Sequence, residues 1–144
     1  MDYETVGAGE FGRSLRGLGL NLLVRDAARS AGFLADVFGM TAHRASADFA
    51  IMGYGGQVFQ LHGDATFARH PLHALLPEAG PRGAGAEIRL YQTDPDAAWA
   101  RARGRNDGVA LREPQDRPHG LREAVILCPD GYAWVPSRPL AAQD

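Results

Sequence analysis

The chain has 144 residues, a length that fits one compact domain or two very small modules sharing a core. Its formal net charge of −2 argues against a surface for nucleic acid or an anionic membrane, and no apolar run approaches the roughly 20 residues of a transmembrane helix. The acidic N-terminus lacks the apolar core of a signal peptide, and a single cysteine, Cys128, allows no internal disulfide. We therefore expect a cytoplasmic protein without nucleic-acid or membrane partners.

The first part of the chain is predicted to form an arm, a strand, a helix and three shorter strands. Residues 1–16 show no clean periodicity, so we expect an N-terminal arm there. Apolar alternation over residues 17–24 predicts a strand. Asp26 is expected to cap the next helix, because a short carboxylate accepts the free N–H groups of a first turn, and Gly39 is expected to end it. The three further strands are predicted over residues 41–45, 48–52 and 57–62.

The second part repeats this order of elements after a Pro- and Gly-rich linker. A strand predicted over residues 86–92 leads to a helix capped by Asp94, in which Trp99 is expected to be the main apolar anchor. Asp26 and Asp94 are 68 residues apart, as are Gly19 and Glu87, and this spacing indicates two βαβββ units. One unit alone does not bury the exposed face of its sheet. The remaining strands are predicted over residues 109–112, 122–127 and 132–135.

Three motifs occur in an order that is typical of one family. They are Asp26-x-x-x-Ser30-x-x-Phe33-Leu34 with Phe38-Gly39-Met40, then Asp94–Ala102, then His119-Gly120-x-Arg122-Glu123 with Pro129–Tyr132. Together they resemble the glyoxalase, bleomycin-resistance and dioxygenase superfamily (vicinal oxygen chelate fold), although Cys128 stands where an Asp is usual. The resemblance covers about residues 17–137.

The resemblance implies an α+β fold in which tandem βαβββ modules form a concave mixed sheet around a cavity, with the helices on the convex side. It also implies a homodimer by family habit. The expected boundaries are an arm at 1–16, modules at 17–66 and 86–137, a linker at 67–85 and a tail at 138–144.

The candidate ligand-binding residues are the polar side chains expected on the concave face. Glu87 is also the candidate catalytic residue, as a base or as the counter-charge of a cationic ligand; alternatively it pairs with Arg89 on the same strand face. The apolar lining expected around them includes Ala50, Met52 and Val135. The full candidate set is Asn21, Gln60, His62, Glu87, Arg89, Tyr91 and Glu123.

The resemblance also says where metal-dependent members place their ligands: Gly19, Gln60, Glu87 and Val135. Two of these four residues have no donor atom in the side chain, whereas a catalytic divalent site normally has three protein ligands. We therefore expect no cofactor. A weaker alternative is Zn, Ni, Mn or Fe held by Gln60, His62 and Glu87.

Three functions remain open at this point. The preferred one is metal-independent binding of a small aromatic or mixed-polarity organic molecule, as in bleomycin-resistance-type proteins. The alternative is a metal-dependent lyase, isomerase or ring-cleaving dioxygenase of the same superfamily, and the third is a scaffold with a filled cavity. Whether the protein is an enzyme is left undecided by these residues.

Overall fold

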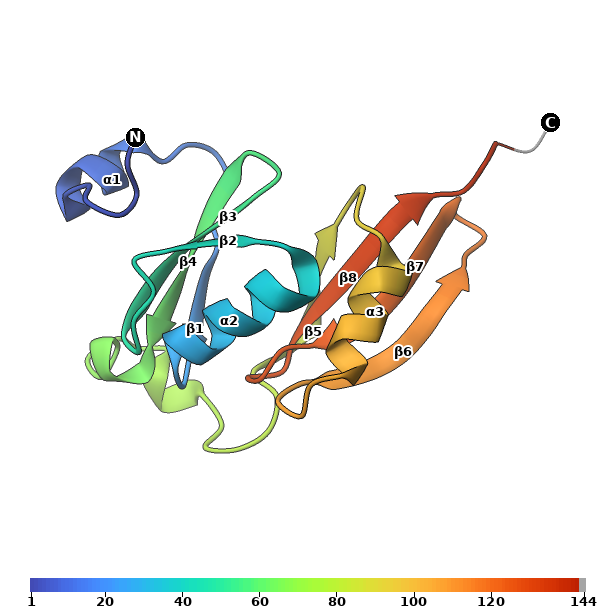
Figure 1. Cartoon of the computed structure of the whole chain (residues 1–144). Helices are drawn as coiled ribbons and strands as arrows, with labels where there is room; N and C mark the ends of the chain where they lie inside the picture. Colours follow the sequence, from blue (N-terminus) through green and yellow to red (C-terminus); the bar gives the residue numbers. More distant parts are fainter. Residues whose placement is uncertain (143–144) are drawn as a thin grey trace. The chain divides into compact units, whose positions relative to one another are not determined.

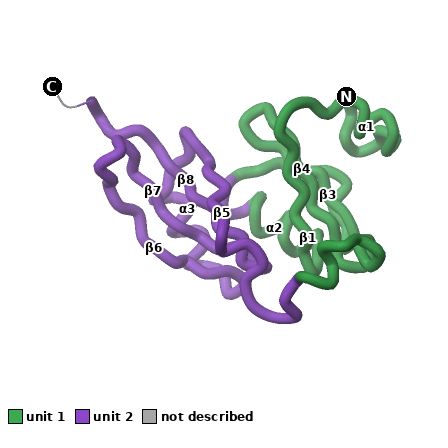
Figure 2. The backbone as a smooth tube through the Cα atoms, turned by 180° about the vertical axis from the view of Figure 1, so that it is seen from behind, with its two compact units in different colours: residues 1–35, 39–75 green, residues 36–38, 76–144 purple. Residues whose placement is uncertain are grey.

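Two four-stranded mixed sheets, each with one main helix, make up the chain in the computed structural model, which describes residues 1–142 (Figure 1). The sheets belong to two compact units (Figure 2). Unit 1 contains Met1–Ala35 and Gly39–Leu75, and unit 2 contains Asp36–Phe38 and the chain from Leu76 onward. Within the described chain, no helix has the length and apolar character needed to cross a membrane.

Unit 1 has the order βαβββ after a short N-terminal helix, and its strands lie in the order β1-β4-β3-β2. β1 is parallel to β4, and the other neighbours are antiparallel. Its elements are α1 (Ala8–Ser14), β1 (Asn21–Val24), α2 (Ala27–Phe38), β2 (Thr41–His43), β3 (Phe49–Tyr54), β4 (Gln57–Gly63) and the short 3-10 helices η1 (Asp64–Thr66) and η2 (His73–Leu75).

The predicted ends of α2 are confirmed. The Asp26 carboxylate accepts a hydrogen bond from the Arg29 backbone N–H at 3.2 Å, and Gly39 ends the helix with φ 74°, a left-handed conformation that favours glycine. The apolar side of α2 is buried against one face of the unit 1 sheet, where Leu22, Val24 and Leu61 are also buried.

The predicted face of β3 is wrong. Tyr54 pairs with Gln57 across the two-residue turn Gly55–Gly56, so even-numbered residues of β3 pair with odd-numbered residues of β4. Ala50 therefore lies beside Leu61 on the α2 side, and Met52 shares that side; both are completely buried. Ile51 takes the place beside Gln60 on the other face, because a change of one residue in register reverses every side chain of a strand.

The N-terminal arm has regular structure that the sequence analysis does not predict. Helix α1 buries Phe11, which joins Val6 and Ile51 in a small apolar cluster, with Phe49 and Val58 packed against it. Ile51 and Val58 lie on the face of the sheet opposite α2. The arm therefore covers part of the face that was expected to line the cavity.

Unit 2 repeats the order βαβββ, with strands in the order β5-β8-β7-β6. β6 is longer than predicted and contains Pro114, which is tolerated because β6 is an edge strand. Helix α3 buries Pro95, Ala98 and Ala102, and Trp99 is partly buried. The elements are β5 (Gly83–Leu90), α3 (Pro95–Arg103), β6 (Val109–Asp116), β7 (Leu121–Leu127) and β8 (Tyr132–Pro139).

Candidate functional site

The face of the unit 2 sheet opposite α3 carries three of the candidate residues, Glu87, Arg89 and Glu123. Trp134 is fully buried and pairs with Ile88 and Ile126, so these mark the face that carries the core. Residues of the alternate set lie on the opposite face. This set comprises Glu87, Arg89, Arg112, Glu123, Val125, Leu127, Ala133, Val135 and Ser137.

Glu123 is the centre of a charged cluster on this face. Its side chain is only 5% exposed, and its carboxylate accepts hydrogen bonds from Arg89 and from Arg112, the latter at 3.4 Å. The His119 Nε2 atom lies 3.0 Å from the same carboxylate. Burial by itself raises the pKa of Glu123, but the hydrogen bonds from Arg89 and His119 outweigh it and hold the pKa below its usual range. Glu123 is therefore a buried anion rather than a proton donor at neutral pH.

Arg89 connects the other two candidates of unit 2 to this centre. One guanidinium nitrogen bonds the Glu87 carboxylate at 2.9 Å and another bonds Glu123. The guanidinium carbon also lies 5.8 Å from the centre of the Tyr91 ring, within the range of a cation–π contact. Of the two interpretations of Glu87, the structure therefore shows the pairing with Arg89. Tyr91 itself is 60% exposed.

Two polar atoms of this face have no hydrogen-bond partner within residues 1–142. They are Nε of Arg112 and the hydroxyl of Ser137, and both atoms are buried. Ser137 pairs with Glu123 across the β7–β8 ladder, so its hydroxyl lies beside the charged cluster. A buried hydroxyl without a partner is unfavourable and uncommon in folded proteins.

Arg112 and His119 belong to the cluster, but neither is among the candidate ligand-binding residues. The predicted strand 109–112 ends at Arg112, whereas β6 continues to Asp116 and places Arg112 opposite Val125. The sequence does indicate that odd-numbered residues of β7 and β8 share this face, because the length of the turn between the two strands fixes which positions pair. Extending the pairing to β6 needs the bulges in that strand, which the sequence does not locate.

The remaining candidates lie in unit 1, on the sheet face opposite α2. Asn21 pairs with Gln60, and Leu23 pairs with His62, so the three polar residues share one face. The His62 Nε2 atom lies 3.1 Å from the Gln60 side-chain oxygen. The His62 ring packs edge-on against Phe49 and Phe67, with centroid distances of 5.1 and 4.7 Å. Burial lowers the pKa of His62, so its imidazole is neutral at pH 7.

The residues present do not fit a catalytic divalent metal. Gly19 and Val135 have no side-chain donor, Glu87 is paired with Arg89, and Gln60 is engaged with His62. Across residues 1–142, no three His, Cys, Asp or Glu side chains lie close enough together to hold a metal ion. A site with one carboxylate and one amide lacks the three ligands that hold zinc or iron tightly.

Solved structures share this fold at low sequence identity. A glyoxalase/bleomycin resistance protein/dioxygenase family enzyme from Burkholderia phytofirmans PsJN has a TM-score of 0.65 and 16% identity, over 84% of this chain and 96% of that one. A glyoxalase/bleomycin resistance protein/dioxygenase from Nocardioides has a TM-score of 0.64 and 20% identity, over 94% of this chain and 95% of that one. TioX from Micromonospora sp. ML1 has a TM-score of 0.60 and 21% identity, over 87% and 99%. These likenesses show the fold.

The comparison with curated proteins gives no match. The family model described as Glyoxalase/Bleomycin resistance protein/Dioxygenase superfamily matches residues 18–135, which include both sheets almost completely. One family thus accounts for the two successive βαβββ units, the capped helices α2 and α3 and the closing β7–β8 hairpin. The chain belongs to the glyoxalase/bleomycin resistance protein/dioxygenase superfamily.

Proposed function

We propose that this chain binds a small organic molecule of mixed polarity without using a metal ion, and that the molecule carries an anionic group. The site is the charged face of unit 2, around Glu123. The observation that carries the proposal is that Arg112 is only weakly paired, although both carboxylates of that face are already paired with Arg89.

Both carboxylates of the face are paired with Arg89, whereas Arg112 is only weakly paired. Glu87 and Glu123 each accept a hydrogen bond from Arg89, but the contact from Arg112 to Glu123 is 3.4 Å long. The Arg112 side chain is 40% exposed, so a solute can reach it. A guanidinium with free donors binds a planar carboxylate through two parallel hydrogen bonds.

Apolar residues separate the two arginines across the sheet. Val135 pairs with Arg89, and Val125 pairs with Arg112. The exposed ring of Tyr91 stands at the end of β5 beside Arg89. A ligand with an apolar or aromatic body and one carboxylate matches this combination of surfaces, since such sites place a few polar groups in a mainly apolar lining.

Thermal denaturation with matched ligands tests the proposal. We expect benzoate and larger aromatic carboxylates to raise the melting temperature more than the matched benzylamines, because a ligand of the folded state stabilises it by mass action. Arg112→Gln should weaken carboxylate binding about 10-fold or more, the value of a charge-assisted hydrogen bond. Arg103→Gln, on an exposed position of α3, is the control and should leave binding unchanged. Equal stabilisation by the amines would contradict the anionic ligand.

Metal analysis separates this proposal from its main competitor. Two structural neighbours are described as enzymes, which supports the alternative of a metal-dependent lyase, isomerase or ring-cleaving dioxygenase. Protein purified without chelator should contain far less than one Zn, Ni, Mn or Fe per chain if binding is metal-independent. A stoichiometric content of any of these metals would favour the enzyme.

We also propose a homodimer, because each sheet has two edge strands that a second copy can cover. Light scattering coupled to size-exclusion chromatography should then give twice the chain mass of 15.5 kDa. A single-chain mass at micromolar concentration would rule the dimer out.

A further inference from the structure

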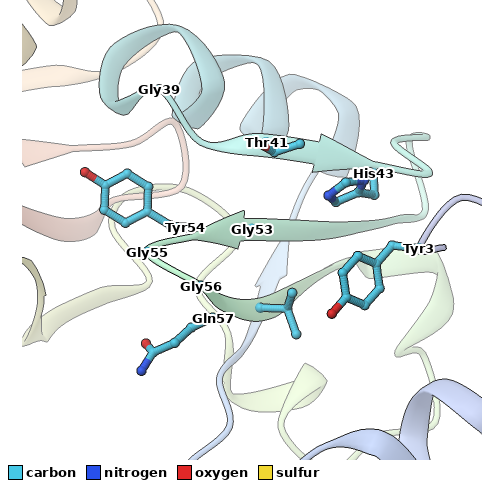
Figure 3. Close-up of a pocket in the computed structure, with 10 residues that line it drawn as sticks. Tyr3, Gly39, Thr41, His43, Gly53, Tyr54, Gly55, Gly56 and Gln57 are labelled. Carbon is cyan, nitrogen blue, oxygen red and sulfur yellow. The ribbon is translucent and has the colours of Figure 1, made fainter. Parts of the chain in front are cut away.

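A hollow lies in unit 1 and shares no residue with the proposed ligand site of unit 2. It is an open groove of about 410 Å³ on β2, β3 and the turn between β3 and β4, within the usual size range of small-molecule sites (Figure 3). Tyr3 and His43 lie at one end, and Tyr54 and Gln57 at the other, with Gly53 between them.

Gly53 forms the floor of this groove. It pairs with Thr41 on β2 and with Val58 on β4, so the groove lies on the sheet face opposite α2. A Cβ atom at Gly53 would lie 3.7 Å from Nε2 of His43 and 3.9 Å from Cβ of Thr41, which are ordinary contacts. The glycine is therefore not required by crowding. Its effect is to leave the middle of the groove open, as at strand positions where a ligand approaches the backbone.

The His43 imidazole is oriented by the N-terminal arm. Its Nδ1 atom lies 3.5 Å from the Glu4 carboxylate, which also accepts the Arg44 backbone N–H at 3.1 and 3.2 Å. The arm is held further by the Arg44 guanidinium, which bonds the Val6 carbonyl at 2.5 Å. A carboxylate beside Nδ1 favours the proton on that nitrogen and leaves Nε2, the atom nearest the Gly53 floor, as an acceptor.

An aromatic wall stands next to this acceptor. The Tyr3 ring lies 5.2 Å from the His43 ring between centroids, and it packs edge-on against Phe11 of α1 at 6.0 Å. Tyr3 therefore reaches the groove only because the arm is docked on the sheet. The groove combines an aromatic wall, a hydrogen-bond acceptor and an open glycine floor, and these features together select a flat ring that bears a donor.

We propose that this groove binds a small planar aromatic molecule bearing a hydroxyl group, which donates its hydrogen bond to Nε2 of His43 while the ring lies over Gly53 beside Tyr3. The proposal does not depend on the function proposed for unit 2, since the two share no residue. It makes the N-terminal arm a part of a binding site.

The direct test is a titration of the full ¹⁵N-labelled chain with p-cresol, followed by amide chemical shifts. We expect saturable shifts centred on residues 41–43 and 53–58, with a dissociation constant of the order of 1 mM for so small a probe. The ether 4-methylanisole, which has no donor, should bind about 3- to 10-fold more weakly, the effect of one neutral hydrogen bond. Shifts centred on Arg89 and Glu123 instead would overturn this proposal and speak for the site in unit 2.

Two variants identify the residues responsible. Gly53→Val fills the floor and should abolish the shifts, whereas Gly85→Val, the same change in β5 where nothing lies within 4 Å of the new Cβ, should leave them intact. His43→Phe keeps an aromatic ring but removes the acceptor, so p-cresol and 4-methylanisole should then bind equally. The proposal fails if p-cresol and the ether bind the unaltered protein equally, or if His43→Phe keeps the difference. This comparison holds even where Gly53→Val does not fold.

Discussion

At the scale of single residues, the stability of the Glu123 carboxylate depends on the cations around it. Glu123→Gln keeps the shape but leaves Arg89 and Arg112 without their shared anion. We expect the free energy of unfolding to fall by about 1–3 kcal/mol, the range for a charged hydrogen-bonded group that loses its partner. Urea denaturation measures it. Glu87→Gln is the control: its side chain is 58% exposed, so its pair with Arg89 contributes little and the change should be within about 0.5 kcal/mol.

The same residue gives a pH dependence with a definite sign. The pKa of Glu123 is lower in the folded chain than in the unfolded chain. Its contribution to stability is therefore present above the ordinary glutamate value of about 4.3 and is lost as the pH falls through the folded value. Unfolding measured from pH 6 to pH 3 should show a steeper loss in the natural chain than in Glu123→Gln. Parallel curves for the two proteins would contradict the lowered pKa.

His62 should affect the stability of the protein in a different pH range. Because burial lowers its pKa, the unfolded chain takes up this proton more readily than the folded chain does. Stability should then fall as the pH drops below about 6.5, the ordinary value for histidine, and be unaffected above it. The difference in melting temperature between the natural chain and His62→Gln should shrink on acidification from pH 7.5 to pH 5.5. A difference that grows instead would show that the folded chain favours the charged imidazole.

At the scale of elements, replacing each of two glycines of helix α2 by alanine should change the stability of the protein in opposite directions. Gly39 ends α2 at φ 74°, so Gly39→Ala should destabilise the protein by about 1 kcal/mol. Gly32 lies exposed in the middle of the same helix with nothing within 4 Å of a new Cβ, so Gly32→Ala should stabilise it by about 0.5–1 kcal/mol. Chemical denaturation of both variants measures whether the free energy of unfolding falls or rises. Destabilisation by Gly32→Ala would mean that the helix packs differently there.

The two hairpins explain how much of the site the sequence predicts. The shared face of Glu123 and Val135 is predicted correctly, because the last pair of this hairpin, Leu127 with Ala133, encloses five residues and so pairs odd positions with odd ones. The two-residue turn between β3 and β4 pairs odd with even, so the predicted side of Ala50 and Met52 is reversed. Alternation shows that a strand has two faces, but only the turn length decides which residues of the next strand join each face.

At the scale of the whole molecule, the family pattern of two βαβββ units is visible in the sequence, whereas the helix of the N-terminal arm and its packing are not. The helix α1 is only 7 residues long and rich in glycine, so its local propensity is weak. Its position is determined by tertiary packing, through Phe11 and Val6 against Ile51 and through the contacts of Arg44 with Glu4 and Val6. Periodicity does not reveal contacts between segments 40 residues apart in the chain.

The arm should therefore contribute measurably to the stability of unit 1. Phe11 is 6% exposed, and Phe11→Ala removes its ring from the cluster with Val6 and Ile51. We expect the free energy of unfolding to fall by about 2–4 kcal/mol, less than for a phenylalanine in a large core because the cluster is small. The uncovered sheet face should also bind a hydrophobic dye more strongly. Leu18→Ala, at a fully exposed position just after the arm, is the matched control and should change neither quantity. If Phe11→Ala behaves like Leu18→Ala, the arm is not packed on the sheet in solution, and Tyr3 is not held at the groove of unit 1 either.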